Sequence, residues 1–132
     1  MKTYLAAYFF TLVAFLVIDF IWLSTMASRL YRPAIGDLLA ENFRLAPAII
    51  FYLIYAAGLT FLAVRPALIS GQWSTALLYG AAVGFMAYAT YDLTNQATLK
   101  SWSTTLTVAD LLWGTFVSAA AAVIGFLVTV RI

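Results

Sequence analysis

Four long apolar runs, separated by shorter polar stretches, make up most of the sequence. A helix that crosses a membrane needs about 20 consecutive, mostly apolar residues. The runs at about residues 4–24, 45–64, 75–95 and 106–130 are of that length, and none carries lysine or arginine near its middle. This pattern predicts an all-α fold, an integral membrane bundle of four helices that forms a single domain over residues 1–132.

The connections between the second, third and fourth runs are short. They cover residues 65–74 and 96–105, and such short connections favour antiparallel neighbours in an up-down bundle. The second helix is expected to end at Arg65-Pro66, because proline disfavours helical geometry in the residue before it. The helices should therefore alternate in direction, with both ends of the chain at one membrane face.

The first connection, residues 25–44, is longer and contains Pro33 and Gly36 as helix breakers. After Gly36, charged and apolar side chains fall on opposite helical faces, which suggests a short amphipathic helix in the membrane interface. An ordinary polar loop fits the same residues equally well. The charged face of such a helix would carry Asp37, Glu41 and Arg44, and the apolar face Leu38, Leu39 and Phe43.

The composition agrees with a lipid environment. The 132 residues are 65% hydrophobic and 9% charged, with a mean hydropathy of +0.99, whereas a soluble domain has about 25% charged residues. Too few charges remain to cover a surface that faces water, so membrane lipid is the expected partner of the helices. Lysine and arginine are divided four against three between the two membrane faces, which leaves the orientation open.

The residue types that are missing exclude several chemistries. The chain has no cysteine and no histidine, which removes disulfides, thiol chemistry, imidazole acid–base catalysis and most zinc sites. A net charge of +2, spread along the chain, gives no support for a nucleic-acid partner. The sequence identifies no metal ligands and leaves any cofactor unknown.

Three of the five carboxylates lie within the predicted helices: Asp19, Asp92 and Asp110. The first and third helices run toward the same membrane face, and the fourth starts from it. With a rise of about 1.5 Å per residue, all three side chains lie within about 4–8 Å of a helix end at that face. Residues three or four positions apart share a helix face. On this basis the companions of the aspartates are Trp22, Trp113, Tyr88 and Asn95.

Two interpretations of the aspartates stay open. An ionised aspartate near the centre of a membrane helix costs about 2.5–3.5 kcal/mol, which favours a functional polar pocket in which at least one acid is neutral and donates a hydrogen bond. The alternative is a structural role. Asp19 and Asp110 could accept hydrogen bonds from tryptophan indoles of neighbouring helices. Asp92 could cap a helix end, or pair with Lys100 or an arginine of the first connection.

Small residues recur on two of the predicted helices. Gly80 and Gly84 form a G-x-x-x-G pair on the third helix, and Gly114 and Ser118 share a row on the fourth. Small side chains let helix backbones approach closely in a membrane. These faces are expected either to join the third helix to the fourth or to join two copies of the chain in a homodimer.

Three short motifs resemble a known family. They are Tyr-Asp-Leu-Thr-Asn-Gln-Ala-Thr-Leu-Lys at residues 91–100, Asp-Phe-Ile-Trp at 19–22 and Asp-Leu-Leu-Trp-Gly at 110–114. In this order across four helices, they resemble a bacterial family of predicted membrane proteins of unknown function. The resemblance covers essentially the whole chain. It implies a four-helix protein of the bacterial inner (plasma) membrane and transfers no reaction.

The sequence supports three functions. The preferred one is a binding or transport module whose acidic pocket holds a small ligand, a cation, a proton or a lipid head group. The second is a membrane-embedded enzyme that modifies a lipid, since carboxylates can serve as acid and base or hold Mg²⁺, although no catalytic motif is recognised. The third is an accessory subunit of a larger membrane complex, in which the aspartates are contacts between helices.

Overall fold

Helices account for nearly all of the described chain. A computed structural model describes residues 2–39 and 44–132, and within these ranges it contains helices and no strand. The all-α prediction is therefore confirmed. The helical segments are α1 (Lys2–Met26), η1 (Ala27–Tyr31), α2 (Arg32–Ile35), η2 (Gly36–Leu38), α3 (Leu45–Leu59), η3 (Thr60–Val64), α4 (Arg65–Ser70), α5 (Trp73–Thr98) and α6 (Thr104–Thr129).

Three continuous helices of the described chain are long and apolar enough to cross a membrane: Lys2–Leu38, Leu45–Ser70 and Thr104–Thr129. The remaining long helix, α5, has 26 residues and so extends about 39 Å, more than the roughly 30 Å hydrocarbon core of a bilayer. It is less apolar than the others because its last turns carry the polar run around Asp92. The four-helix bundle is confirmed, with α5 as its most polar long helix.

The second long helix does not end at Arg65-Pro66. Proline lies in the first turn of α4, where a missing N–H is tolerated, and Arg65 keeps helical geometry. The π-helical segment η3 precedes it, and its wider turns accommodate the proline ring. The helix therefore continues to Ser70 and ends before Gly71, whose left-handed φ of 74° suits a residue without a side chain.

The first connection is also more helical than its sequence indicates. α1 continues through η1, α2 and η2, so the helical run ends at Leu38. Pro33 again lies in the first turn of a short helix and does not break one. The short helical segments between the first two long helices, α2 and η2, end before Leu39. The backbones of Leu39 and Arg44 are extended. The rest of the expected amphipathic helix, residues 40–43, lies outside the described residues.

The most extensive contact in the bundle joins α5 to α6, followed by the contact of α1 with α6. Small residues explain the contact between α5 and α6. A Cβ added to Gly84 would lie 2.2 Å from the backbone oxygen of Gly114. One added to Gly80 would lie 3.0 Å from Ala122, and Ser118 is fully buried in the same contact. The G-x-x-x-G face thus joins α5 to α6 within one chain, so a homodimer would need another face.

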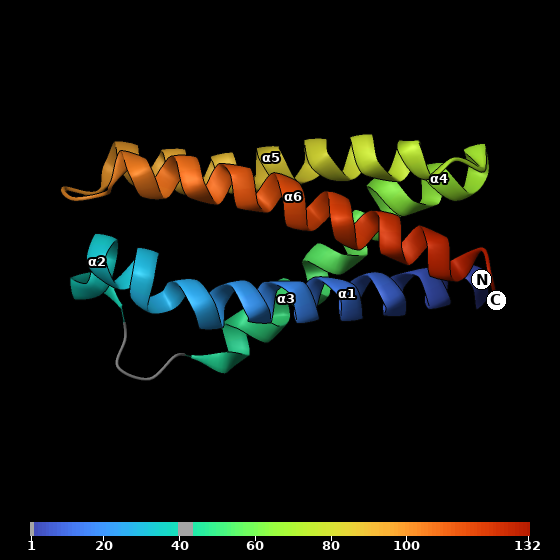
Figure 1. Ribbon diagram of the computed structural model, residues 1–132, viewed down its shortest axis with the longest axis horizontal. Helices are drawn as coiled ribbons and strands as arrows, with labels where there is room; N and C mark the ends of the chain where they lie inside the picture. Colours follow the sequence, from blue (N-terminus) through green and yellow to red (C-terminus); the bar gives the residue numbers. More distant parts are fainter. Residues whose placement is uncertain (1, 40–43) are drawn as a thin grey trace.

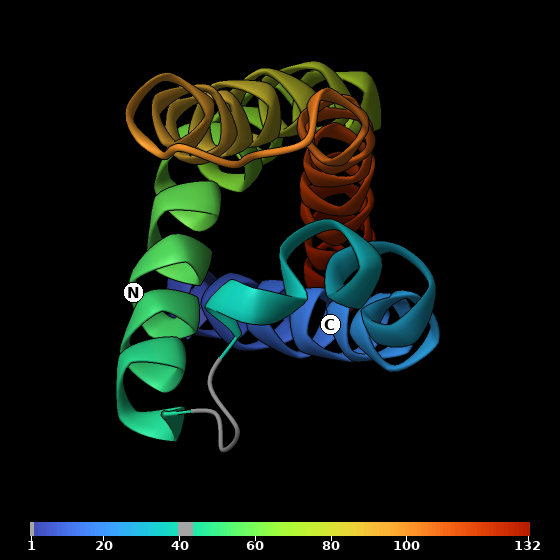
Figure 2. The same cartoon turned by 90° about the vertical axis from the view of Figure 1, so that its left-hand side faces the viewer.

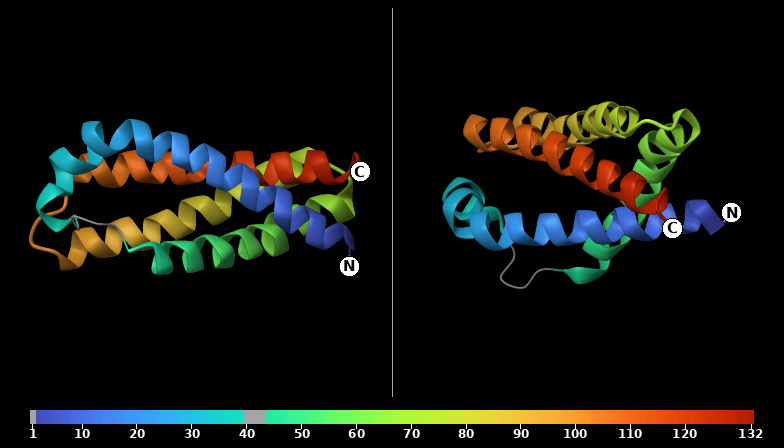
Figure 3. Two further views of the ribbon diagram at one scale, coloured as in Figure 1. Left: turned by 90° about the horizontal axis from the view of Figure 1, so that it is seen from below. Right: turned by 45° about the vertical axis from the view of Figure 1, so that its right-hand side comes forward.

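The four long helices surround a common axis, as the end-on view shows (Figure 2). Both termini lie at one end of the bundle, and α2 and the α5–α6 connection lie at the other (Figure 1). α3 crosses α1 obliquely (Figure 3), and its buried residues, Tyr55, Ala56 and Leu59, lie in its second half. Its first half stands away from the bundle, with Leu45 and Ile49 69% and 53% exposed. The bundle is therefore more open toward α2 than toward the termini.

Candidate functional site

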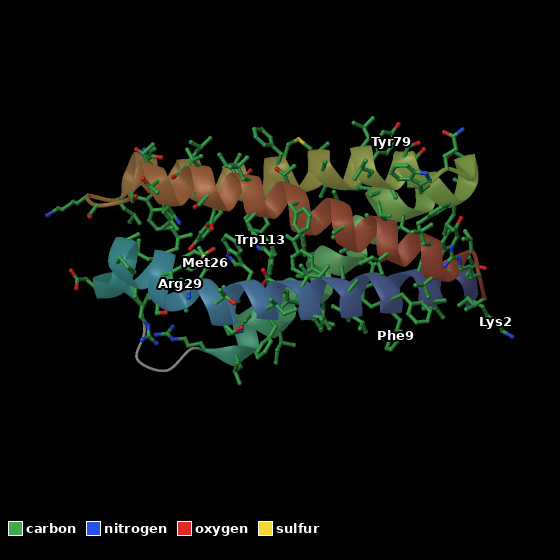
Figure 4. All side chains as sticks on the ribbon, viewed as in Figure 1. Lys2, Phe9, Met26, Arg29, Tyr79 and Trp113 are labelled. Carbon is green, nitrogen blue, oxygen red and sulfur yellow. The ribbon has the colours of Figure 1, made fainter. Side chains whose placement is uncertain are left out.

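The three aspartates of the long helices are buried in the half of the bundle near α2. Asp19 on α1 is 6% exposed, Asp92 on α5 is 0% exposed and Asp110 on α6 is 4% exposed. Figure 4 shows Arg29 at this end of the molecule and Lys2 at the opposite end. The structure therefore brings together residues from three helices, but it gives each carboxyl group different surroundings.

Asp19 accepts a hydrogen bond on each of its oxygens. Oδ2 accepts from the hydroxyl of Tyr52 on α3 at 2.6 Å, and Oδ1 accepts from the indole N–H of Trp113 on α6 at 3.0 Å. Figure 4 shows Trp113 in the space between α6 and α1. One carboxylate thus connects three helices, as the structural interpretation expects for this residue.

Asp110 accepts a hydrogen bond from the last residue of a chain of aromatic contacts. The indole of Trp113 stacks on that of Trp22, with ring centroids 4.3 Å apart and an interplanar angle of 9°. Trp22 donates its N–H to the Tyr31 hydroxyl at 2.8 Å, and Tyr31 donates to Oδ1 of Asp110 at 2.5 Å. Tyr31 is the last residue of η1, the π-helical segment that precedes the proline of α2. Asp110 therefore accepts from a phenol and not from the expected indole.

Asp92 has no such donor. Among the described residues, no N–H or hydroxyl group donates a hydrogen bond to either of its oxygens. The expected pairing with Lys100 or an arginine does not form, and Lys100 is exposed. Asp92 lies on α5 and Asp110 on α6, the two helices that make the most extensive contact in the bundle.

A cavity of about 300 Å³ opens beside Asp110. Its wall is formed by Phe51 from α3, by Ala87, Tyr88 and Tyr91 from α5, and by Asp110 from α6. The wall is mainly apolar and aromatic, with one carboxylate. Two hollows of about 400 and 380 Å³ on other sides of the molecule are lined without any acidic residue. The cavity beside Asp110 can therefore hold an apolar body that carries a positive charge or a hydrogen-bond donor.

The remaining companions expected from the sequence lie close to this cavity, but neither donates to Asp92. Tyr88 packs its ring over Gly114, where an added Cβ would lie 2.2 Å from two ring atoms. Asn95 lies one turn beyond Tyr91 on α5. Tyr88 thus belongs to the cavity wall, whereas Asn95 is not among the residues that line it.

Sequence reasoning missed several aromatic residues of this region. Their partners lie on other helices, so spacing along the chain gives no signal for them. Tyr91 is the exception, because it is adjacent to Asp92 within the motif at residues 91–100. The residues missed are Tyr31, Phe51, Tyr52 and Tyr91.

The fold and the acidic cluster define a helical integral membrane protein with three buried aspartates in one half of its bundle. Within residues 2–39 and 44–132, no three acidic side chains converge as metal ligands would. The chain belongs to the family described as predicted membrane protein (DUF2177), whose model matches residues 4–127. The family resemblance of its sequence is thereby confirmed, and location in a bacterial inner membrane stays a prediction. Comparison with curated proteins and with solved structures found no match.

Proposed function

We propose that the protein binds an organic ammonium cation inside the membrane, in the cavity beside Asp110. The observation that carries this proposal is the wall of the cavity, which combines one carboxylate with the rings of Phe51, Tyr88 and Tyr91. An ammonium group is attracted both by a carboxylate and by the faces of aromatic rings, most strongly where water is excluded. The volume of about 300 Å³ matches the lower end of the range for small-molecule sites.

The position of the cavity favours a cation with apolar substituents. The first half of α3 stands away from the bundle, and Ile49 and Ile50 are 53% and 56% exposed. A ligand that passes between α3 and α5 comes from the hydrocarbon region and must be soluble there. A free hydrophobic cation and the ammonium head group of a lipid both meet this condition, and they share the group that Asp110 would bind.

The aspartates take different parts in this proposal. Asp19 accepts hydrogen bonds from Tyr52 and Trp113 and is not among the residues that line the cavity, so its part is to support the bundle. Asp110 has one oxygen bonded to Tyr31 and also lines the cavity, so it is the carboxylate that would face the cation. A structural role for one aspartate and a ligand-binding role for another are therefore compatible.

The test is calorimetric titration of the purified full chain in detergent with benzyltrimethylammonium, a cation that has no proton to release. Its uncharged analogue neopentylbenzene has the same shape. We expect binding of the cation and at least about tenfold weaker binding of the analogue. Asp110→Asn should lower the affinity for the cation by about the same factor, whereas Asp37→Asn, which alters an exposed carboxylate of η2, should leave it unchanged. Equal binding of the cation and the analogue would refute the proposal.

The two sources of the ammonium group are distinguished in nanodiscs. If a lipid head group is the ligand, discs of phosphatidylcholine should compete with benzyltrimethylammonium, whereas discs of an uncharged galactolipid should not. If the ligand is a free cation, the affinity should be the same in both. The Asp110→Asn variant, measured in both kinds of disc, corrects for binding of the cation to the lipid surface.

A further inference from the structure

The hollow of about 380 Å³ lies between α1 and the second long helix. α4 and the start of α1 lie at the end of the bundle that carries both termini (Figure 1), so this hollow opens near one membrane surface. Ala57 lies two helical turns before Arg65 and is therefore roughly 11 Å deeper in the membrane. The wall is formed by Tyr4 and Tyr8 from α1, Ala57 from α3, Thr60 and Phe61 from η3, and Arg65, the first residue of α4.

The charged side chains of the described residues are divided unevenly between the two ends of the bundle. The acidic ones all lie in the half near α2, and they are Asp19, Asp37, Asp92 and Asp110. At the end that carries the termini, where Figure 4 shows Lys2, the charged side chains of residues 2–39 and 44–132 are all basic: Lys2, Arg65 and Arg131. A group of positive charges without a nearby acid attracts anions.

The guanidinium of Arg65 lies over an aromatic ring within this hollow. Its central carbon is 5.2 Å from the centroid of the Phe61 ring, which is a cation–π contact. Arginine has five N–H donors, so this contact leaves donors for a second partner. Tyr4 lines the same hollow and brings a hydroxyl group that can also donate. Such donors suit the oxygens of a phosphate, which arginine binds with two parallel hydrogen bonds.

Buried neighbours fix the wall of the hollow in place. Val64 precedes Arg65 and Ala7 precedes Tyr8, and both are 0% exposed members of one core cluster. The Tyr8 hydroxyl donates to the backbone oxygen of Leu53 at 3.1 Å, which ties α1 to α3 beside the hollow. A site whose elements are packed before the ligand arrives loses little conformational freedom on binding.

We propose that this hollow binds an anionic phospholipid, with the phosphate on Arg65 and one acyl chain along Ala57 and Phe61. One basic side chain, with no acid in the wall, matches a single phosphate. The apolar residues below it match hydrocarbon, for which a soluble phosphate has no use. This site goes beyond the proposed function, because it lies at the opposite end of the bundle and binds a ligand of opposite charge.

Native mass spectrometry of the full chain in nonionic detergent measures this binding. The two ligands are dioleoylphosphatidylglycerol and an uncharged galactolipid with the same acyl chains. We expect phosphatidylglycerol to bind at least about fivefold more tightly, the effect of one basic residue near a membrane surface. Arg65→Gln should abolish this preference and leave the affinity for the galactolipid unchanged. Arg131→Gln is the matched control, because it removes the same charge at the same end but does not line the hollow.

Equal affinities of the two lipids for the unsubstituted protein would overturn the proposal. An equal loss of preference in Arg65→Gln and Arg131→Gln would do so as well, since the lipid would then respond only to the general charge of that end. A weaker affinity of Arg65→Gln for the galactolipid would assign Arg65 to the fold and not to the phosphate.

Glycerophosphoglycerol, the head group without acyl chains, separates a lipid from a soluble phosphate. It should not compete at the lipid concentrations used, and competition would overturn the assignment to a phospholipid. None of these outcomes depends on whether the cavity beside Asp110 binds a cation.

Discussion

Replacing Gly114 by alanine is the most direct test of the packing that shapes the cavity wall. The ring of Tyr88 lies over this glycine, and a Cβ added there would approach two ring atoms to 2.2 Å and a third to 2.7 Å. Ordinary contact begins at 3.4 Å, so the ring would have to retreat by about 1.2 Å. Since several atoms of one rigid ring clash together, a small rotation cannot relieve them all.

The size of the effect follows from two opposing contributions. Overpacking of this kind costs typically about 1–3 kcal/mol. Alanine in place of glycine within a helix returns about 0.5–1 kcal/mol. The difference spans about 0–2.5 kcal/mol, and because several atoms of one rigid ring clash together we expect Gly114→Ala to lower the free energy of unfolding by about 1–2.5 kcal/mol. Gly58→Ala on α3 is the matched control, because an added Cβ there would have no atom within 4 Å and should be neutral or slightly stabilising.

The assay is reversible unfolding in mixed micelles with increasing sodium dodecyl sulfate, followed by circular dichroism. A double-mutant cycle with Tyr88→Ala identifies the cause, because removal of the ring leaves room for the new methyl group. In that background Gly114→Ala should cost nothing. If it destabilises the Tyr88→Ala protein as much as the unsubstituted one, or if it is as harmless as Gly58→Ala, then the ring does not lie where the structure places it.

Three further predictions follow from the same contacts. Gly84→Ala should lower the unfolding free energy more than Gly80→Ala. A Cβ at position 84 would lie 2.2 Å from a rigid backbone atom, whereas the shortest contact of a Cβ at position 80 would be 3.0 Å. Equal losses in micelle unfolding would contradict this prediction. Tyr52→Phe removes one of the two donors to buried Asp19 and should cost about 1–3 kcal/mol in the same assay, with a cost near zero as the contrary result. Tyr31→Phe breaks the link between an indole and a carboxylate, so it should alter tryptophan fluorescence while leaving the helix content unchanged by circular dichroism.

The long helices were predictable from the sequence because their signal is local. A run of apolar residues needs no partner to be recognised. The depth of Asp19 below a helix end was not predicted in the same way, because the helical run of α1 continues to Leu38. The helix ends were less predictable at Pro33 and Pro66. Proline breaks a helix when its neighbours cannot adjust, but here π-helical turns precede both prolines and the helices continue. Nothing in a single sequence shows that such an adjustment is available.

The partners of the aspartates were predictable only in part, because they depend on which helices become neighbours. Tryptophan three residues from an aspartate suggests an indole donor, and Asp19 does accept one, but from the tryptophan that follows Asp110. Trp22, which follows Asp19, donates to a tyrosine. The residue types were therefore informative, and of the two expected pairings with an indole of a neighbouring helix, that of Asp19 forms and that of Asp110 does not. A spacing of three along one helix places two side chains on the same face, and each can then turn to a different neighbour.

The structural and the ligand-binding interpretation of the acidic cluster involve the same series of contacts. Asp19 holds Trp113, whose indole stacks on Trp22, and Trp22 donates to the tyrosine that donates to Asp110. The contacts that fasten the helices are thus the contacts that orient the carboxylate of the cavity. A group that serves only to hold helices together needs no such continuation to a second acid. The continuation is explained if the bundle has to hold one carboxylate, that of Asp110, at the edge of a cavity.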